Sequence, residues 1–387
     1  MLIAVSVACG WTAWSGHVLT LPVAGLFPTL WAMSPSRLTA VLVSAGYILA
    51  ASRGLPQGVA NFYAADLWPG LLLWTAASLS FASVHAALWK ARPEGKSQGE
   101  GRTEMAPRYL VAALLMGLPP LGITGWAHPL TATGVLFPGW GWWGLVAMTA
   151  GLAMMTSRYW PAVAIVLGGF WLWSAATWTS PDLPEGWKGV DLEQGPSLGR
   201  DGSLDYHRDL IATVRAAAGE KNRFIVLPES ALGFWTPTVA RVWSQGMRGS
   251  ELTVIAGAAA IDPGGYDNVM VTISADEARI LYRQRMPVPV SMWRPWRAWT
   301  GQGGGVSANL FDNPVVQSDG QMVAVLICYE QLLLWPVLQS MLHSPTAIVA
   351  PGNGWWTAGT SIAAIQTASV IAWAKLFGLP VVTAFNT

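Results

Sequence analysis

The chain has 387 residues, of which 52% are apolar and 11% are charged, and its 22 basic residues nearly balance its 21 acidic ones. This balance argues against a nucleic-acid-binding surface, which needs clustered positive charge. The two cysteines, Cys9 and Cys328, come without a repeated Cys/His spacing, which argues against a structural disulfide and a zinc site. We therefore expect neither a metal nor a cofactor.

Charged residues are sparse up to about residue 180 and ordinary in number from about residue 185 onward. The first part holds about seven apolar segments, namely Leu2–Trp14, Leu19–Met33, Leu38–Ala51, Leu67–Leu88, Tyr109–Gly125, Gly134–Met155 and Trp160–Trp178. A spanning helix needs about 20 mostly apolar residues. The first three segments are shorter, so we expect tilted hairpins or partly re-entrant segments there. The composition predicts a multi-helix transmembrane domain over residues 1–180.

The linker 90–108 holds the strongest basic cluster, which consists of Lys90, Arg92, Lys96, Arg102 and Arg108. Positive charge favours the cytoplasmic side of a bacterial membrane. With this linker in the cytoplasm, alternation of the helices places Arg37 and Arg158 there too, and only Arg53 falls on the opposite side. We therefore expect a multi-pass protein of the bacterial inner membrane with a periplasmic C-terminal domain, residues 185–387.

The C-terminal domain alternates between short apolar runs and amphipathic stretches. The expected strands are Gly189–Gln194, Arg223–Leu227, Thr253–Ala260, Asn268–Ser274, Ala278–Tyr282, Met322–Ile327, Ala347–Ala350 and Pro380–Ala384. The expected helices are Tyr206–Ala218, Leu332–Leu342 and Ile362–Phe377. The long segment Pro287–Ala308 is expected to be a loop that covers or forms a site. Strands that alternate with helices predict an α/β sandwich around a mostly buried sheet.

Two of the expected strands end in a reactive side chain. Arg223–Leu227 runs into Glu229, and Met322–Ile327 runs into Cys328. The ends of different strands converge at one edge of such a sheet, where a carboxylate can take the proton of a thiol and activate it as a nucleophile. The alternatives are that Cys328 packs as a small hydrophobe and that Glu229 is an N-cap or surface carboxylate.

Five short elements together resemble the nitrilase superfamily of carbon-nitrogen hydrolases. In chain order they are Leu227-Pro228-Glu229-Ser230, Gly257 with Tyr266-Asp267-Asn268, Leu326-Ile327-Cys328-Tyr329-Glu330, Asn353-Gly354-Trp355-Trp356 and Thr383-Ala384-Phe385-Asn386-Thr387. They follow the family's order and cover nearly the whole C-terminal domain. A multi-helix membrane half before such a domain resembles the apolipoprotein N-acyltransferases and, more closely, the TraB family of plasmid conjugal transfer proteins.

The resemblance implies an αββα sandwich with a Glu–Lys–Cys triad that attacks an amide or ester carbonyl and forms a thioester. It implies that Glu229 is the base and Cys328 the nucleophile. It also implies that Glu330 is a supporting carboxylate, with Tyr329 beside it in the same element.

In the family pattern the triad lysine stands in Tyr-x-Lys, shortly before a Val-Pro pair. In this chain Tyr282-Arg283-Gln284-Arg285 precedes Val288-Pro289, so the resemblance places Gln284 at the lysine position. Arg285 is the expected catalytic substitute, and Arg283 is a second source of positive charge for a developing oxyanion. Arginine stays protonated and holds its charge in a different geometry from an ammonium. The alternative is that both arginines are strand-end residues that face solvent.

We expect a membrane-anchored protein of plasmid conjugal transfer that acts as a thiol-dependent amide hydrolase or acyltransferase through a Cys328 acyl-enzyme. Its expected partners are the lipid bilayer, a phospholipid or a protein amine or amide as substrate, and proteins of the conjugation apparatus, but no nucleic acid. Two alternatives stay open. One is an apolipoprotein N-acyltransferase of lipoprotein maturation, and the other is a catalytically silent membrane scaffold of the transfer apparatus, which Gln284 favours.

Overall fold

The computed structural model describes residues 1–91, 104–197, 202–262, 264–300, 305–318 and 320–387. The chain divides into two compact units. The helical unit comprises Met1–Pro181, Leu332–Trp335 and Gly359–Leu379, and the α/β unit comprises Asp182–Gln331, Pro336–Ala358 and Pro380–Thr387. Part of the basic linker, with Arg92, Lys96 and Arg102, lies outside the described residues, as do residues 301–304 of the expected long loop.

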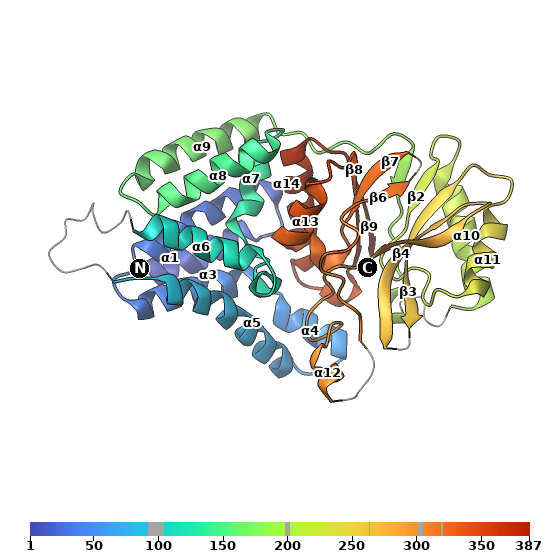
Figure 1. The fold of residues 1–387 in the computed structure, drawn as a ribbon, viewed down its shortest axis with the longest axis horizontal. Helices are drawn as coiled ribbons and strands as arrows, with labels where there is room; N and C mark the ends of the chain where they lie inside the picture. Colours follow the sequence, from blue (N-terminus) through green and yellow to red (C-terminus); the bar gives the residue numbers. More distant parts are fainter. Residues whose placement is uncertain (92–103, 198–201, 263, 301–304, 319) are drawn as a thin grey trace. The chain divides into compact units, whose positions relative to one another are not determined.

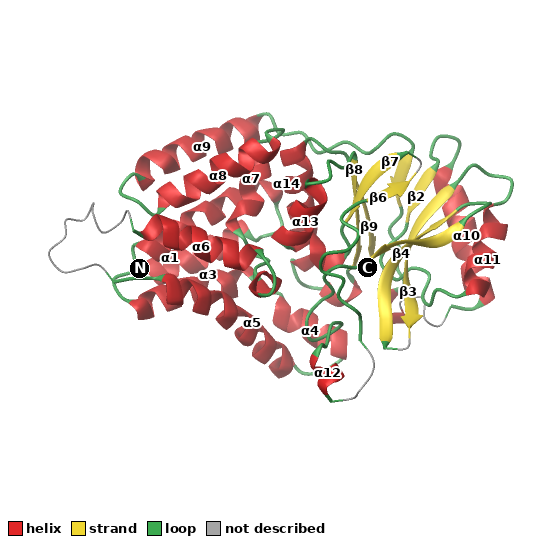
Figure 2. Cartoon of the chain, in the orientation of Figure 1, coloured by secondary structure: helices red, strands yellow, loops and turns green. Residues whose placement is uncertain are grey.

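The helical unit contains α-helices joined by loops and short 3-10 helices (Figure 2). Its α-helices are α1 (Leu2–Ala13), α2 (Phe27–Ala32), α3 (Arg37–Ala51), α4 (Leu55–Tyr63), α5 (Leu67–Leu88), α6 (Met105–Gly117), α7 (Thr133–Leu136), α8 (Gly141–Met155), α9 (Trp160–Ala176) and α14 (Ile362–Phe377). Its 3-10 helices are η1 (Val18–Leu26), η2 (Leu121–Thr124) and η3 (Pro129–Ala132). All seven expected apolar segments therefore contain helix, and α4 is an additional helix that the segments did not include.

Most of these helices are shorter than a membrane-spanning helix. In the part of the chain that the structure describes, α5 is the single unbroken helix that is long and apolar enough to cross a membrane, and α3 with α4 passes the same test only as a pair bent by 50°. Proline explains two of the breaks: Pro22 lies inside η1, and Pro119 follows the end of α6, where its ring prevents a regular helix from continuing.

The expected helix Ile362–Phe377 forms with those bounds as α14, but it belongs to the helical unit. There it packs against α7, α8, η1 and η3. Its side chains are apolar around most of the helix, and Val370, Trp373 and Leu376 are buried. A helix that is apolar on all sides is suited to burial on all sides, which explains why this segment forms an interior helix of the helical unit.

The α/β unit contains two sheets (Figures 1 and 2). The first has the order β1 (Trp187–Gly189), β2 (Phe224–Val226), β3 (Thr253–Asp262), β4 (Gly265–Ile273) and β5 (Ala278–Arg283). The second has the order β6 (Val316–Ser318), β7 (Gln321–Val325), β8 (Ala347–Asn353) and β9 (Val381–Asn386). β1, β2 and β3 are parallel, as are β7, β8 and β9, and the remaining pairs are antiparallel.

Strand β2 shows how the α/β unit fills two cores. Ile225 packs in the core that the first sheet forms with α10 (Leu204–Ala218) and α11 (Pro237–Met247). Phe224 and Val226 pack in the second core, which combines residues of both sheets and includes Cys328. Since β2 is buried on both faces, its sequence is an uninterrupted apolar run. The expected α/β fold is confirmed for this unit, and its two sheets agree with the two-sheet sandwich that the resemblance implies.

The sequence missed α11 and β6, and it placed the first strand at Gly189–Gln194 where the structure has β1 at Trp187–Gly189. Within Pro287–Ala308 the described residues form the single-turn helix α12 (Trp296–Trp299). The expected helix Leu332–Leu342 is α13 (Leu334–Met341), and its first two residues belong to the helical unit.

Candidate active site

Glu229 is the third residue after the end of β2, in a turn that packs against β3. The turn is held by the Gly257 N–H, which donates to Pro228 O at 3.1 Å, and by the Leu232 N–H, which donates to Gly257 O at 2.9 Å. A Cβ on residue 257 would lie 2.5 Å from Glu229 Cα. Glycine at this position therefore allows the turn to approach β3, and the Glu229 side chain is almost fully buried.

Cys328 follows β7 at a sharp bend of the chain. Leu326 continues the pairing with β8 through a 2.9 Å hydrogen bond from its N–H to Val349 O, and the 3-10 helix η5 (Cys328–Leu332) begins at the cysteine. The φ angle of Cys328 is +49°. A non-glycine residue in the left-handed region is strained and persists only where its surroundings hold it, which is a frequent property of functional residues.

The Cys328 thiol is a hydrogen-bond partner of the Glu229 carboxylate. Burial raises the pKa of Glu229 from 4.5 to about 7, hydrogen bonds from Asn268 and Cys328 lower it, and the nearby Glu330 charge raises it. A carboxyl group with a pKa near neutral is suited to accept and return a proton. The two strand ends expected to converge do so, because the Cys328 side chain is among the groups that act on the Glu229 carboxyl.

Two buried amides connect the base to the position of the triad lysine. Asn268 on β4 donates from Nδ2 to Glu229 Oε1 at 2.5 Å and to Gln284 Oε1 at 2.9 Å. Gln284 in turn donates from Nε2 to the carbonyl oxygen of Ile327 at 3.2 Å, directly before the cysteine. Gln284 thus lies inside the cluster of Glu229 and Cys328, with a neutral amide where the family pattern has an ammonium.

Glu330 connects the cysteine bend to the segment that follows Gln284. Its carboxylate accepts hydrogen bonds from the backbone N–H of Ile327 at 2.7 Å, of Arg285 at 2.6 Å and of Met286 at 3.1 Å. The Tyr282 hydroxyl donates to it as well. Burial raises the pKa of Glu330, while the Arg285 guanidinium and the backbone N–H groups lower it. The supporting role expected for Glu330 is consistent with these contacts.

Arg285 is fully buried. Its guanidinium donates to the Tyr282 hydroxyl, to Gln339 Oε1 and to Ser340 Oγ, each at 2.9 Å. Gln339 and Ser340 lie on α13, so this arginine joins β5 to that helix. The alternative, that Arg285 is a strand-end residue that faces solvent, is wrong. The guanidinium also donates to Val325 O at 3.5 Å. Its expected role as a catalytic substitute stays a prediction.

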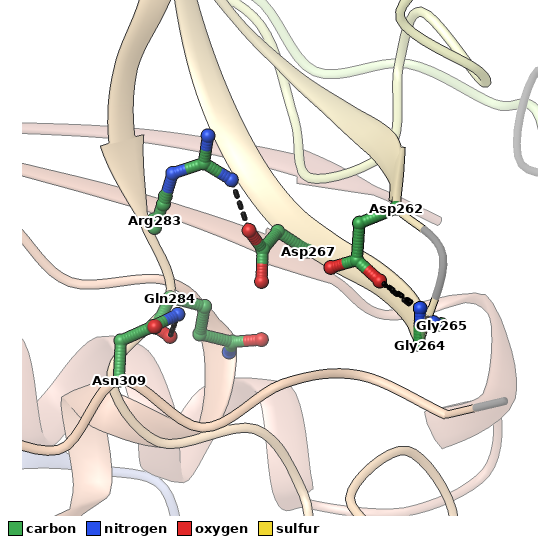
Figure 3. Close-up of polar contacts among 7 residues, drawn as sticks. All are labelled: Asp262, Gly264, Gly265, Asp267, Arg283, Gln284 and Asn309. Carbon is green, nitrogen blue, oxygen red and sulfur yellow. Dashed lines mark hydrogen bonds and ion pairs between the residues drawn. The ribbon is translucent and has the colours of Figure 1, made fainter. Parts of the chain in front are cut away.

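Arg283 forms an ion pair with Asp267 on the neighbouring strand, and Figure 3 shows the two side chains directed toward each other. The Gln284 side chain leaves the chain in another direction, and Asn309 donates to the Gln284 carbonyl oxygen at 3.3 Å (Figure 3). In the same view Asp262 accepts hydrogen bonds from the N–H groups of the tight turn at the end of β3. Arg283 is therefore engaged at the partly exposed edge of the sheet.

The two C-terminal motif elements lie on neighbouring strands. Asn386 on β9 donates from Nδ2 to Asn353 Oδ1 on β8 at 3.0 Å and accepts the backbone N–H of Gln194 at 2.7 Å. Phe385, which replaces the threonine of the family pattern, packs against Gly352, where a Cβ would lie 2.4 Å from the ring. These contacts join β8 and β9 of the second sheet. Tyr329, the remaining expected site residue, is half-buried, and burial raises its pKa.

Asn268 is the site residue whose role the sequence analysis missed. It was part of a recognised motif, but no chemistry was assigned to it. The signal was the alternation along β4: Asn268 shares a face with Met270, which packs in the core between the sheets. A polar amide at an inward-facing strand position has to find buried hydrogen-bond partners, and here they are Glu229 and Gln284.

Comparison with known proteins agrees with these motifs. The sequence profile of the family described as Carbon-nitrogen hydrolase matches residues 49–375. The conjugal transfer protein TraB of Agrobacterium fabrum is 72% identical over all of this chain and 92% of that protein. The probable conjugal transfer protein TraB of Sinorhizobium fredii is 60% identical over all of this chain and 98% of that protein. The resemblance inferred from the motifs is confirmed.

Solved structures give matches of lower similarity. A mutant of the Nesterenkonia AN1 amidase from the nitrilase superfamily is 13% identical, with a TM-score of 0.39 over 52% of this chain and 78% of that chain. The carbon-nitrogen hydrolase of Helicobacter pylori G27 is also 13% identical, with a TM-score of 0.38 over 51% of this chain and 73% of that chain.

Proposed function

The chain belongs to the carbon-nitrogen hydrolase (nitrilase) superfamily and to its TraB conjugal transfer proteins, and from this premise we propose that it is a thiol-dependent acyl-transferring enzyme of plasmid conjugation. The observation that carries the proposal is the buried hydrogen bond between Glu229 and Cys328. A buried carboxyl with a pKa of about 7 beside a cysteine with a φ angle of +49° combines two features that are frequent at functional sites.

In the proposed first half-reaction, Glu229 takes the thiol proton as the sulfur of Cys328 attacks the carbonyl carbon of an amide or ester. The S–C bond forms and the carbonyl π electrons move to oxygen. When the C=O bond re-forms, the bond to the leaving group breaks, and Glu229 returns its proton to the leaving amine or alcohol. The product is a thioester on Cys328.

In the second half-reaction, Glu229 takes a proton from water or from an amine as that nucleophile attacks the thioester. Collapse of the adduct breaks the S–C bond, and the leaving sulfur regains the proton from Glu229. Water as acceptor gives hydrolysis, and an amine gives N-acyl transfer. The same base therefore serves both directions of proton transfer, which its pKa of about 7 suits.

We also propose that the helical unit lies in the bacterial inner membrane as a multi-pass anchor, with the α/β unit in the periplasm. In support, helices other than α5 also present large apolar side chains outward. On α9, Ile165 and Leu172 are 76% and 72% exposed, and on α8, Trp143 is 77% exposed. Apolar surface of this extent marks an interaction with lipid or protein. The short helices would enter the bilayer as tilted or re-entrant segments rather than as full spans.

The orientation is testable with two single-cysteine variants in a background that lacks both native cysteines, Cys9→Ser with Cys328→Ser. Lys90→Cys lies in the basic linker and Glu277→Cys in a turn of the α/β unit, and both native side chains are half-exposed. A membrane-impermeant maleimide should label Glu277→Cys in cells with a permeabilised outer membrane, and Lys90→Cys only after the inner membrane is broken. The reverse pattern would place the α/β unit in the cytoplasm.

One observation favours a second function, a catalytically silent scaffold of the transfer apparatus. Gln284 carries no charge where the family pattern has a lysine, and this removes one electrostatic element of catalysis. A Cys328→Ala strain separates the two proposals. Loss of conjugal transfer with normal protein level supports the enzyme, and transfer at the wild-type frequency supports the scaffold.

A further inference from the structure

We propose that Gln284 is the oxyanion donor of this site and that Asn268 is the positioning residue that aims it; this rests on the proposed acyl transfer. The side-chain amide of Gln284 makes two hydrogen bonds. Its oxygen accepts from Asn268, and its nitrogen donates one hydrogen to Ile327 O. Among the described residues no other acceptor meets that nitrogen, so one N–H of a fully buried group is unused next to the nucleophile.

A glutamine amide has two possible orientations, and only one of them presents N–H groups to the cysteine strand. Asn268 Nδ2 contributes only donors, because a primary amide nitrogen cannot accept. Its hydrogen bond to Gln284 Oε1 therefore fixes the oxygen on the Asn268 side and the nitrogen on the Ile327 side. The Gln284 backbone is held as well, since its N–H donates to Asn268 O at 2.8 Å.

The same nitrogen of Asn268 gives its other hydrogen to Glu229. Asn268 thus sets the position of the base and the orientation of Gln284 together. When sulfur attacks a carbonyl, the negative charge that develops on oxygen needs a donor that is already in place. The free N–H of Gln284 is a neutral donor of this kind, in the position where the family pattern supplies an ammonium.

Two probes separate this role from a structural one. Iodoacetamide alkylates a thiol by displacement at carbon, without an oxyanion, so its reaction at the Cys328 peptide, followed apart from that of Cys9, reports only the activation of Cys328. p-Nitrophenyl acetate acylates the thiol through a tetrahedral oxyanion. The full-length protein in detergent would be tested as wild type, Gln284→Met, Gln284→Ala and Asn268→Ala. Asn309→Ala is the matched control, because Asn309 contacts the backbone oxygen of Gln284 rather than its side chain.

Both Gln284 variants should lower the rate of acylation about 10²-fold and leave the rate of alkylation within a few-fold of wild type. Asn268→Ala should lower acylation to the same extent and also move the pH midpoint of alkylation upward, because Glu229 loses an N–H donor. Asn309→Ala should change neither rate.

Equal slowing of both reactions in Gln284→Met, or no slowing of either, would overturn the inference while leaving the proposed function intact. A wild-type protein that is alkylated but never acylated would instead overturn the proposed function and this inference with it. Since methionine nearly conserves the volume of glutamine, a folded variant is expected even if the alanine variant is unstable.

Discussion

The hydroxyl of Tyr282 lies 2.9 Å from both carboxylate oxygens of Glu330, and the same hydroxyl accepts the Nε–H of Arg285. The Tyr282 hydroxyl thus connects the buried Glu330 carboxyl group to the buried Arg285 guanidinium. Glu330 holds Ile327, Arg285 and Met286 by their backbone N–H groups. The cysteine bend and the segment after Gln284 are therefore kept in register by one carboxylate.

Removing the Arg285 guanidinium from its contacts with Tyr282 and Glu330 should destabilise the fold strongly. Arg285→Met leaves the Glu330 carboxylate buried without its counter-charge, and breaking a buried pair in this way costs about 3–5 kcal/mol. Tyr282→Phe removes a hydroxyl but no charge and should cost about 1–3 kcal/mol. Chemical unfolding of the full-length protein in detergent, followed by tryptophan fluorescence, measures both.

Arg279→Met is the control for the arginine variant. Arg279 pairs with Glu277 on the surface, where both side chains are about half-exposed, and such pairs contribute little. The control should unfold with wild-type stability. If Arg285→Met also unfolded with wild-type stability, the buried contacts among Arg285, Tyr282 and Glu330 would not stabilise the fold as we expect.

Gly257→Ala should displace the catalytic base. The new Cβ would lie 2.4 Å from Ser230 N and 2.5 Å from Glu229 Cα, and backbone atoms cannot move aside independently. A displacement of about 1 Å in a catalytic group can cost about 10²-fold in rate, so iodoacetamide alkylation of Cys328 should slow by that order. Gly168→Ala in α9, where a Cβ meets nothing within 4 Å, should react like wild type; a Gly257→Ala protein that matched it would show that the close approach is dispensable.

The buried Glu229 carboxyl should make stability depend on pH. Its pKa is about 7 in the folded state against an ordinary 4.5, so between these values the folded state binds more protons than the unfolded state. Stability contributed by this group is full below about 4.5 and is lost as pH rises through about 7. Glu229→Gln should therefore be more stable than wild type at pH 8, by at most about 3 kcal/mol, and similar to it at pH 4.5.

The matched control for this prediction is Glu251→Gln, which removes an exposed carboxylate beside Arg223. Its Tm difference from wild type should be small at both pH values. A Glu229→Gln protein that is less stable than wild type at pH 8 would contradict a raised pKa for Glu229.

The sequence was sufficient to predict the two strand ends that meet. Strand β2 and strand β7 are local apolar runs, and the polar residue after each was expected at the same sheet edge. Arg285 shows what local pattern does not reveal. Arginine is rarely buried without partners, and its partners here, Gln339 and Ser340, lie on a helix far along the chain. Its burial follows from tertiary packing and not from its neighbours in sequence.

Helix α14 was predicted with the correct bounds but assigned to the C-terminal domain by its place in the chain. Its interior position in the helical unit depends on contacts with α7 and α8, which precede it by more than two hundred residues. The apolar segments of the first 180 residues were likewise found, but most of their helices are shorter than a full span. Hydropathy therefore indicates where an apolar helix forms, but not how long it is.

The most direct test of acyl transfer is a search for a covalent acyl group on Cys328. Full-length protein purified with bacterial phospholipids, and a second sample treated with p-nitrophenyl acetate, would be examined by intact mass and peptide mapping beside Glu229→Gln and Cys328→Ser. We expect one acyl group on the Cys328 peptide of the wild type, greatly slowed in Glu229→Gln and absent in Cys328→Ser. A folded wild-type protein that forms no adduct with either donor, or one that is acylated at other residues and not at Cys328, would contradict the proposed chemistry.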